Sequence, residues 1–122
     1  MIIGIGTDLV EIERVVKACE KEAFLLRSFT SEEILMIEKD KRKAADNFAV
    51  KEAVSKMFGT GFRGITLTEI EVLRDSLGKP YVNLYGNAKK IEMELGIQKI
   101  HVSITNTKDL AEAFVVGEGE ER

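Results

Sequence analysis

Two charged side chains one helical turn apart are the first candidates for chemistry. Glu52 and Lys56 lie in residues 47–61, NFAVKEAVSKMFGTG, whose apolar residues share one helical arc while Lys51, Glu52, Ser55 and Lys56 fall on the other. A carboxylate can bind a cation and an ammonium group a phosphate, and their spacing predicts that they project side by side. Backbone donors follow at Gly59, Thr60 and Gly61. The stretch therefore indicates a phosphoryl-transfer site, although such charges are also typical of a solvated helix face.

A second carboxylate, Asp8, could complete a metal site. It ends an apolar run, residues 2–9, that predicts a β-strand, in which Gly4 and Gly6 permit a close backbone approach. Asp8 could equally be the N-cap of the helix predicted after it. The lone Gly-Ile-Gly does not indicate a dinucleotide-binding fold, because that fingerprint needs a third glycine and a long parallel repeat.

The elements that must position these residues are helices and strands in mixed order. Four helices are predicted. The first covers residues 11–21, and the second begins after an N-cap at Thr30, whose capping box includes Glu33, and runs to about residue 40. The third is the central stretch, and the fourth runs from a cap at Asn87 through Leu95. Strands are predicted over residues 65–73, 80–85, 99–105 and 111–116, followed by a frayed acidic tail at 117–122. This pattern predicts an α+β fold, an antiparallel β-sheet packed against helices, in a single domain over residues 1–122.

The composition of the chain limits the classes of binding partner and the cellular location that can be expected. With 44% hydrophobic and 32% charged residues and a net charge of −3, the chain is expected to be soluble and shows no bulk attraction to nucleic acid or anionic membrane. No segment reaches transmembrane length and the N-terminus lacks a signal peptide, so a cytoplasmic location is expected. Cys19 falls on the apolar face of its predicted helix, which predicts a buried, unreactive thiol.

Other polar residues carry weaker signals. A basic cluster precedes the central helix and consists of Lys39, Lys41, Arg42 and Lys43. It is interpreted either as solvated surface or as a contact for a phosphate group. His101 shares a predicted strand face with Ser103, but no further ligands or triad partners are apparent. A surface or interface histidine is the expected role.

Five segments together resemble the holo-(acyl-carrier-protein) synthases, the small single-copy type of 4′-phosphopantetheinyl transferase. They are GIGTDLVEIERV at 4–15, RSFTSEEI at 27–34, FAVKEAVSKMFGTG at 48–61, GKPYV at 78–82 and HVSIT at 101–105. The resemblance spans nearly the whole chain in the same order and spacing. It implies a Mg²⁺-dependent transfer of the phosphopantetheine arm of coenzyme A to a serine of apo-acyl carrier protein, releasing adenosine 3′,5′-bisphosphate and serving fatty acid biosynthesis.

The resemblance also implies roles for individual residues. Asp8 and Glu52 match the metal carboxylates, and Lys56 matches the lysine beside the pyrophosphate. The remaining coenzyme-binding positions are Gly59, Thr60, Gly61, Gly78, Lys79, Pro80, Thr105 and Asn106, of which 78–80 match a turn near the adenine. Either Glu52 or a water held by the metal site would take the proton of the carrier serine.

Partners follow from the same resemblance. Arg14 matches a basic position on the helix that docks the acidic carrier protein, and Lys17 and Lys21 extend the same basic stripe. The family's compact members are homotrimers with active sites between subunits, and the resemblance implies this assembly here.

Two positions depart from the pattern. Many relatives have Arg where this chain has Asn47, and His where it has Asn106, so phosphate contacts there would fall to Lys39, Lys41, Arg42 or Lys43. Asn106 can donate hydrogen bonds but cannot carry charge. A non-catalytic coenzyme-binding module and a purely structural α+β subunit stay open as alternatives.

Overall fold

The α+β class is confirmed by the computed structural model, which describes residues 1–120 and contains two antiparallel sheets and five helices in that range. One sheet has the strand order β1-β5-β4, and the other pairs β2 with β3. The strands are β1 (Ile2–Glu11), β2 (Ile70–Arg74), β3 (Pro80–Leu84), β4 (Lys99–Asn106) and β5 (Leu110–Glu118). The helices are α1 (Ile12–Ala18), α2 (Glu22–Ser28), α3 (Ser31–Lys39), α4 (Lys43–Phe58) and α5 (Gly86–Leu95), with a 3-10 turn at Leu67–Glu69.

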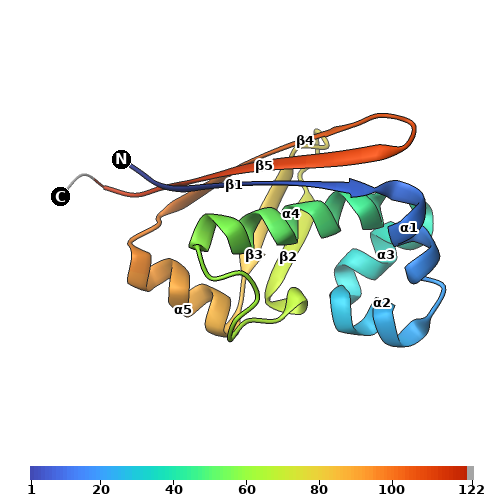
Figure 1. Cartoon of the computed structure of the whole chain (residues 1–122), viewed down its shortest axis with the longest axis horizontal. Helices are drawn as coiled ribbons and strands as arrows, with labels where there is room; N and C mark the ends of the chain where they lie inside the picture. The colour runs from blue at the N-terminus through green and yellow to red at the C-terminus, as the bar shows by residue number, and fades with distance from the viewer. Residues whose placement is uncertain (121–122) are drawn as a thin grey trace.

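Helix α4 is the central element and is covered on several sides. The three-stranded sheet lies along one side of it, helices α1 to α3 gather at its N-terminal end, and α5 lies near its C-terminal end (Figure 1). The expected polar face is therefore wrong in part: Lys51 and Ser55 are buried, whereas Lys56 is exposed. Neighbouring strands, rather than the pattern along the helix, decide which side chains of a wrapped helix meet solvent.

The close approach expected at Gly4 and Gly6 is confirmed. A Cβ atom added to Gly6 would collide with the carbonyl oxygen of Ala53, and one added to Gly4 would collide with that of Met57. Both carbonyls belong to α4, so strand β1 packs directly on the helix backbone. Only glycine allows this contact, because any side chain would push the strand away.

Two apolar cores lie along α4. One surrounds the C-terminal part of α4 and includes Val50, Val54, Ile70, Val72 and Val115. The other joins the N-terminal end of α4 to α1, α2 and α3. Helix α2 was not predicted; its N-cap residue, Lys21, makes no side-chain capping bond, so the usual start signal is missing.

Several predicted helix ends can be compared directly. The capping box at Thr30 and Glu33 is confirmed by two reciprocal hydrogen bonds, of 3.0 and 3.3 Å. Asp8 as an N-cap is wrong, because α1 begins only at Ile12 and Asp8 lies within β1. Asn87 as a cap is also wrong: α5 begins at Gly86, and the Asn87 side chain donates to the carbonyl of Gly64 instead.

The chain ends form a paired edge rather than the frayed tail expected from residue 117. Gly117 and Glu118 belong to β5, and the terminal ammonium of Met1 donates to the carbonyl of Gly119 at 2.5 Å. Residues 121–122 lie outside the described part of the chain. None of the helices within residues 1–120 has the length and apolar character needed to cross a membrane.

Candidate functional site

Strand β1 and helix α4 bring Asp8, Glu52 and Lys56 together. The Lys56 ammonium lies 3.0 Å from a carboxylate oxygen of Asp8 and also donates to the carbonyl of Thr7 at 3.1 Å. Gly6 and Asp8 are two residues apart on β1, so both face α4. The glycine contact with α4 thus sets the distance between the strand carboxylate and the helix side chains.

Electrostatics at Glu52 show that the two carboxylates repel each other. Burial raises the pKa of Glu52, the nearby charge of Asp8 raises it further, and Lys56 lowers it. Burial and a like charge both disfavour the ionised form, and a bound cation would relieve both effects. A carboxyl group perturbed in this way is a marker of a functional site.

This pair of carboxylates fits a magnesium ion better than a transition metal. Mg²⁺ binds oxygen ligands and commonly takes one or two carboxylates, with phosphate oxygens and water completing its shell. Within residues 1–120 no group of three or more His, Cys, Asp or Glu side chains gathers to hold a metal. Asp8 and Glu52 are oxygen donors of the kind that Mg²⁺ binds, and an ion held by these two carboxylates would need further ligands from outside the chain.

The glycine-containing turn follows at the C-terminal end of α4. Gly59 and Gly61 have φ angles of 79° and 59°, and a Cβ atom at either position would meet no other atom within 4 Å. Backbone conformation rather than space therefore requires glycine there. The Thr60 hydroxyl donates to the Gly61 carbonyl at 2.8 Å. The turn begins three residues after Lys56 and leaves open space around its backbone.

A second group of implied residues lies at the other end of α4. The Asn106 amide donates to Asp46 at 3.0 Å, and Arg42 donates to the carbonyls of Thr107 and Lys108 at 2.6 and 3.0 Å. Asp46 and Lys56 are ten residues apart, which is about 15 Å along a helix axis. One chain therefore does not bring Asn106 next to the Asp8–Glu52–Lys56 site.

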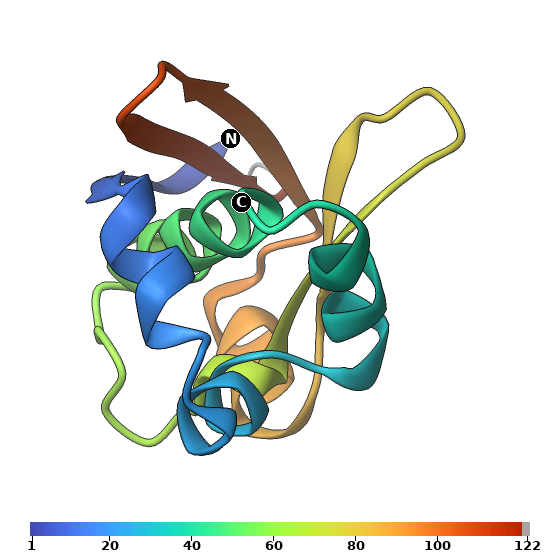
Figure 2. The same ribbon diagram turned by 90° about the vertical axis from the view of Figure 1, so that its right-hand side faces the viewer.

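The turn at Gly78, Lys79 and Pro80 lies in the β2–β3 hairpin, whose yellow tip extends away from the helices in Figure 2. Asp75 holds the turn by accepting the backbone N–H groups of Leu77 and Lys79, both at 2.9 Å. A cavity of about 390 Å³ opens between this hairpin and β4. Its lining includes Lys79, Pro80, Tyr81, Lys99 and His101.

Strand β4 contributes two further predicted residues, both exposed. Thr105 faces solvent, and His101 lies within hydrogen-bond distance of Glu118, at 2.9 Å, on the exposed surface. The same outer face of the β1–β5–β4 sheet carries Ile5, Leu9 and Phe114, which are 59%, 58% and 46% exposed. Three large apolar side chains on one open sheet face are more than isolated surface residues require.

Sequence reasoning missed a buried polar network beside the site. The Lys51 ammonium pairs with Glu33 at 2.8 Å, and both side chains are completely buried. Lys51 also donates to the carbonyls of Leu67 and Ile70. Asn47, equally buried, donates to Glu33 and to the carbonyl of Val72, so it is not placed to contact a ligand.

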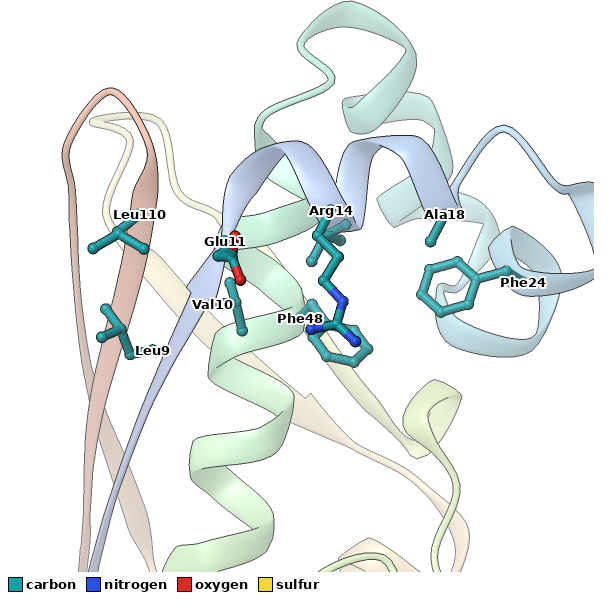
Figure 3. Close-up of a pocket in the computed structure, with 9 residues that line it drawn as sticks. Leu9, Val10, Glu11, Arg14, Ala18, Phe24, Phe48 and Leu110 are labelled. Carbon is teal, nitrogen blue, oxygen red and sulfur yellow. The ribbon is translucent and has the colours of Figure 1, made fainter.

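The basic stripe of Arg14, Lys17 and Lys21 borders two depressions near α1 and α2. One, of about 640 Å³, includes Leu9, Arg14, Phe24 and Phe48 in its lining (Figure 3). The other, of about 420 Å³, is lined by the three basic residues together with Ala18, Phe24 and Arg27. This surface therefore combines positive charge with exposed apolar contacts. Cys19 is only half-buried, and burial raises its pKa, which favours the unreactive thiol.

Comparison with known proteins gives a consistent family. The model of the 4′-phosphopantetheinyl transferase superfamily matches residues 4–115. The "Holo-[acyl-carrier-protein] synthase" of Lachnoclostridium phytofermentans is 64% identical over 118 residues, covering 97% of both chains.

Solved structures agree in fold. The holo-[acyl-carrier-protein] synthase of Neisseria meningitidis is 36% identical, with a TM-score of 0.87 over 97% of this chain and 99% of its own. That of Helicobacter pylori, solved in complex with coenzyme A, is 32% identical, with a TM-score of 0.81 over 93% and 99% of the two chains. The shared fold, the full-length identity and the matching family model lead to one conclusion: the chain belongs to the 4′-phosphopantetheinyl transferase superfamily, and within it to the holo-(acyl-carrier-protein) synthases.

Proposed function

We propose that this chain transfers the 4′-phosphopantetheine arm of coenzyme A to a serine of apo-acyl carrier protein, in the cytoplasm, with Mg²⁺, as a step serving fatty acid biosynthesis. The products are holo-acyl carrier protein and adenosine 3′,5′-bisphosphate. The observation that carries the proposal is the meeting of Asp8, Glu52 and Lys56 across the β1–α4 contact. Family membership and the solved coenzyme A complex of a relative support it.

In the reaction, the serine oxygen forms a bond to the phosphorus that carries the pantetheine arm, and the bond from that phosphorus to the bridging pyrophosphate oxygen breaks. Asp8 and Glu52 would hold Mg²⁺, which would supply charge neutralisation at the pyrophosphate when bound. Lys56 stabilises the negative charge that grows on the departing bisphosphate. The serine proton goes to Glu52, whose pKa is raised, or to a water held beside it.

The coenzyme would be bound by two groups of residues. Lys56 and the backbone of Gly59, Thr60 and Gly61 face the pyrophosphate, while the turn at 78–80 and the end of β4 at Thr105 and Asn106 hold the nucleotide. The separation of about 15 Å along α4 between these groups supports a site completed by a second subunit. The exposed apolar face of the β1–β5–β4 sheet supports a homotrimer as the assembly.

The carrier protein would dock on α1. Arg14, Lys17 and Lys21 would attract an acidic partner and orient it, despite the net charge of −3 on the whole chain. The adjoining apolar depression lined by Phe24 and Phe48 would receive an apolar side chain of that partner.

Transfer is tested by incubating the chain with coenzyme A, Mg²⁺ and an apo-acyl carrier protein and weighing the carrier by mass spectrometry. We expect the carrier to gain the mass of the phosphopantetheine arm, only when Mg²⁺ is present. Coenzyme binding without any such gain, across several carriers on which a known transferase works, would favour the binding module instead.

Docking is tested separately with the charge reversals Arg14→Glu and Lys17→Glu. We expect each to raise the KM for the carrier about tenfold or more while the KM for coenzyme A stays the same, and the effect to shrink at high salt. Lys90→Glu, a charge reversal on the exposed face of α5, is the matched control. An unchanged carrier KM in both reversals would remove α1 as the docking surface.

A further inference from the structure

Arg74 is the partly exposed end of a polar network that is otherwise buried. It is the last residue of β2, and its guanidinium donates to the side-chain oxygen of Asn47 at 2.9 Å and to the carbonyl of Leu73 at 3.3 Å. A guanidinium has five N–H donors, and the described contacts use two of them. The others are available to an anion at the surface.

The network behind Arg74 fixes the direction of its acceptor. The Asn47 amide nitrogen donates to Glu33 and to the carbonyl of Val72, both at 2.9 Å, so its oxygen must face Arg74. Glu33 in turn pairs with the buried Lys51. Apolar side chains of similar volume would often be at least as stable as such a buried ion pair. The polar network instead fixes the orientation of the Asn47 side-chain oxygen that accepts from Arg74.

The charge of Arg74 is not cancelled inside the network. Burial lowers its pKa, and the carboxylates of Asp46 and Glu33 act in the opposite direction. Lys51 already neutralises Glu33, and Asp46 acts on the guanidinium only at a distance, without forming an ion pair with it. Asp46 also accepts a hydrogen bond from Asn106. Asp46 therefore contacts the end of β4 directly and influences Arg74 through its charge alone.

The position of Arg74 indicates which phosphate it can reach. In the hairpin register Arg74 pairs with Pro80, and the neighbouring Lys79 and Lys99 line the cavity beside the turn. Lys56, by contrast, is nine residues beyond Asn47, about 13 Å along α4. Coenzyme A has two anionic centres, the pyrophosphate and the 3′-phosphate on the adenosine ribose. Lys56 serves the first, and Arg74 lies beside the turn that would hold the adenosine.

We infer that Arg74 binds the 3′-phosphate of coenzyme A and that Asn47 is a positioning residue that holds Arg74 in place. This inference rests on the proposed function, because it assigns a contact within the coenzyme site. It gives Arg74 and Asn47 a part in coenzyme selectivity that the motifs of the chain do not assign.

The experiment compares coenzyme A with 3′-dephospho-coenzyme A by calorimetry, at fixed Mg²⁺, in the unaltered protein, Arg74→Gln, Arg74→Lys and Asn47→Ala. We expect Arg74→Gln to weaken coenzyme A binding about 10- to 100-fold, as for a lost charge-assisted contact, and dephospho-coenzyme binding by less than about twofold. Arg74→Lys keeps the positive charge but loses the forked arrangement of guanidinium donors, so we expect a smaller loss of affinity for coenzyme A than in Arg74→Gln. Asn47→Ala should reduce the same preference partly, and Lys90→Gln not at all.

The preference between the two coenzymes is measured within each variant, so a general loss of stability cancels. An Arg74→Gln protein that keeps the full preference for coenzyme A would overturn the inference, and so would an equal loss of affinity for both coenzymes. Failure of the unaltered protein to transfer the arm would instead count against the proposed function. If Arg74→Gln does not fold, Arg74→Lys decides: an undiminished preference contradicts the contact.

Discussion

At the scale of single residues, the ionised carboxylate of Glu52 destabilises the folded protein. Burial and the charge of Asp8 raise its pKa by more than Lys56 lowers it, so the folded protein binds this proton more strongly than the unfolded chain does. Stability is therefore lost as pH rises from the ordinary value of 4.5 through the higher folded pKa. Above that window, Glu52 carries its full electrostatic penalty unless a cation is bound.

Glu52→Gln should therefore raise the melting temperature of the metal-free protein at pH 7 to 8 and abolish transfer. The stabilisation should become small near pH 4, below the ordinary value of 4.5, because the wild-type carboxyl is then mostly protonated in both states. Adding Mg²⁺ should raise the melting temperature of the wild type but not of the variant. Thermal denaturation between pH 4 and 8 checks this; a variant less stable than the wild type at pH 8 would contradict it.

Lys51 and Glu33 give a second residue-scale prediction, because their charges lie where water cannot replace a lost partner. Lys51→Met should destabilise the fold by about 3–5 kcal/mol, since it leaves the buried Glu33 carboxylate unpaired. The double variant Glu33→Leu with Lys51→Met should recover most of that loss. Urea unfolding measures both, and a double variant no more stable than the single one would rule out the unpaired charge as the cause.

The contrast between these two sites shows what sequence reasoning can reach. Asp8, Glu52 and Lys56 were predicted because carboxylates and an ammonium at that spacing match a known motif. Lys51 was not, because a lysine beside a glutamate on a helix already has an ordinary explanation at the surface. The packing of α3, the 3-10 turn and β2 around α4 decides that Lys51 points inward. Asn47 and Arg74 belong to the same network.

At the scale of elements, the contact between β1 and α4 determines the geometry of the site. Gly6→Ala should push β1 away from the Ala53 carbonyl and cost about 1–3 kcal/mol, as overpacking does. Because Asp8 moves with the strand, transfer should fall far more than the loss of folded protein explains. Urea unfolding and kcat at saturating substrates measure the two effects.

A matched control is Gly64→Ala. Gly64 has a φ angle of 77° and open space around it, so this change introduces backbone strain without moving β1. Its kcat should remain near that of the wild type. Equal losses of kcat in the two variants would show that destabilisation alone, and not the strand position, lowers activity.

Most elements were predictable, and the exceptions share a physical cause. Periodic apolar patterns and the Thr30 capping box located β1, α3, β3 and β4 closely. Helix α2 lacks a side-chain cap, and α4 begins at Lys43, four residues before the expected start, because tertiary packing extends it through Ala44 and Ala45. Local signals do not report such tertiary contributions.

At the scale of the whole molecule, the open face of the β1–β5–β4 sheet calls for a partner. If it is the trimer interface, Phe114→Glu should bury a charge there and yield monomers in sedimentation velocity, with transfer lost because each site would need two subunits. Met93→Glu, at an exposed position on α5, should leave both properties unchanged. An active, trimeric Phe114→Glu protein would show that subunits meet elsewhere.

Assembly was the level least accessible from the residues. The sequence predicted an antiparallel sheet packed against helices, and the structure agrees, but the pattern does not reveal that Ile5, Leu9 and Phe114 gather on the outer side of the sheet. The registers of β1 and β4 against β5 bring them together. The trimer was expected from the family resemblance alone.

The buried amine of Lys51 can also be used to measure how often the folded protein opens. A water-soluble acylating reagent would label the exposed lysines of the native molecule quickly, but it would reach Lys51 only after α4 separates from β2. Mass spectrometry can follow the labelling of the peptide that carries Lys51 without denaturant. The labelling rate would therefore measure how often α4 separates from β2. Coenzyme A and Mg²⁺ should slow this rate by a factor of one plus the ratio of the free ligand concentration to its Kd, because they bind the folded state and lower the population of the open one.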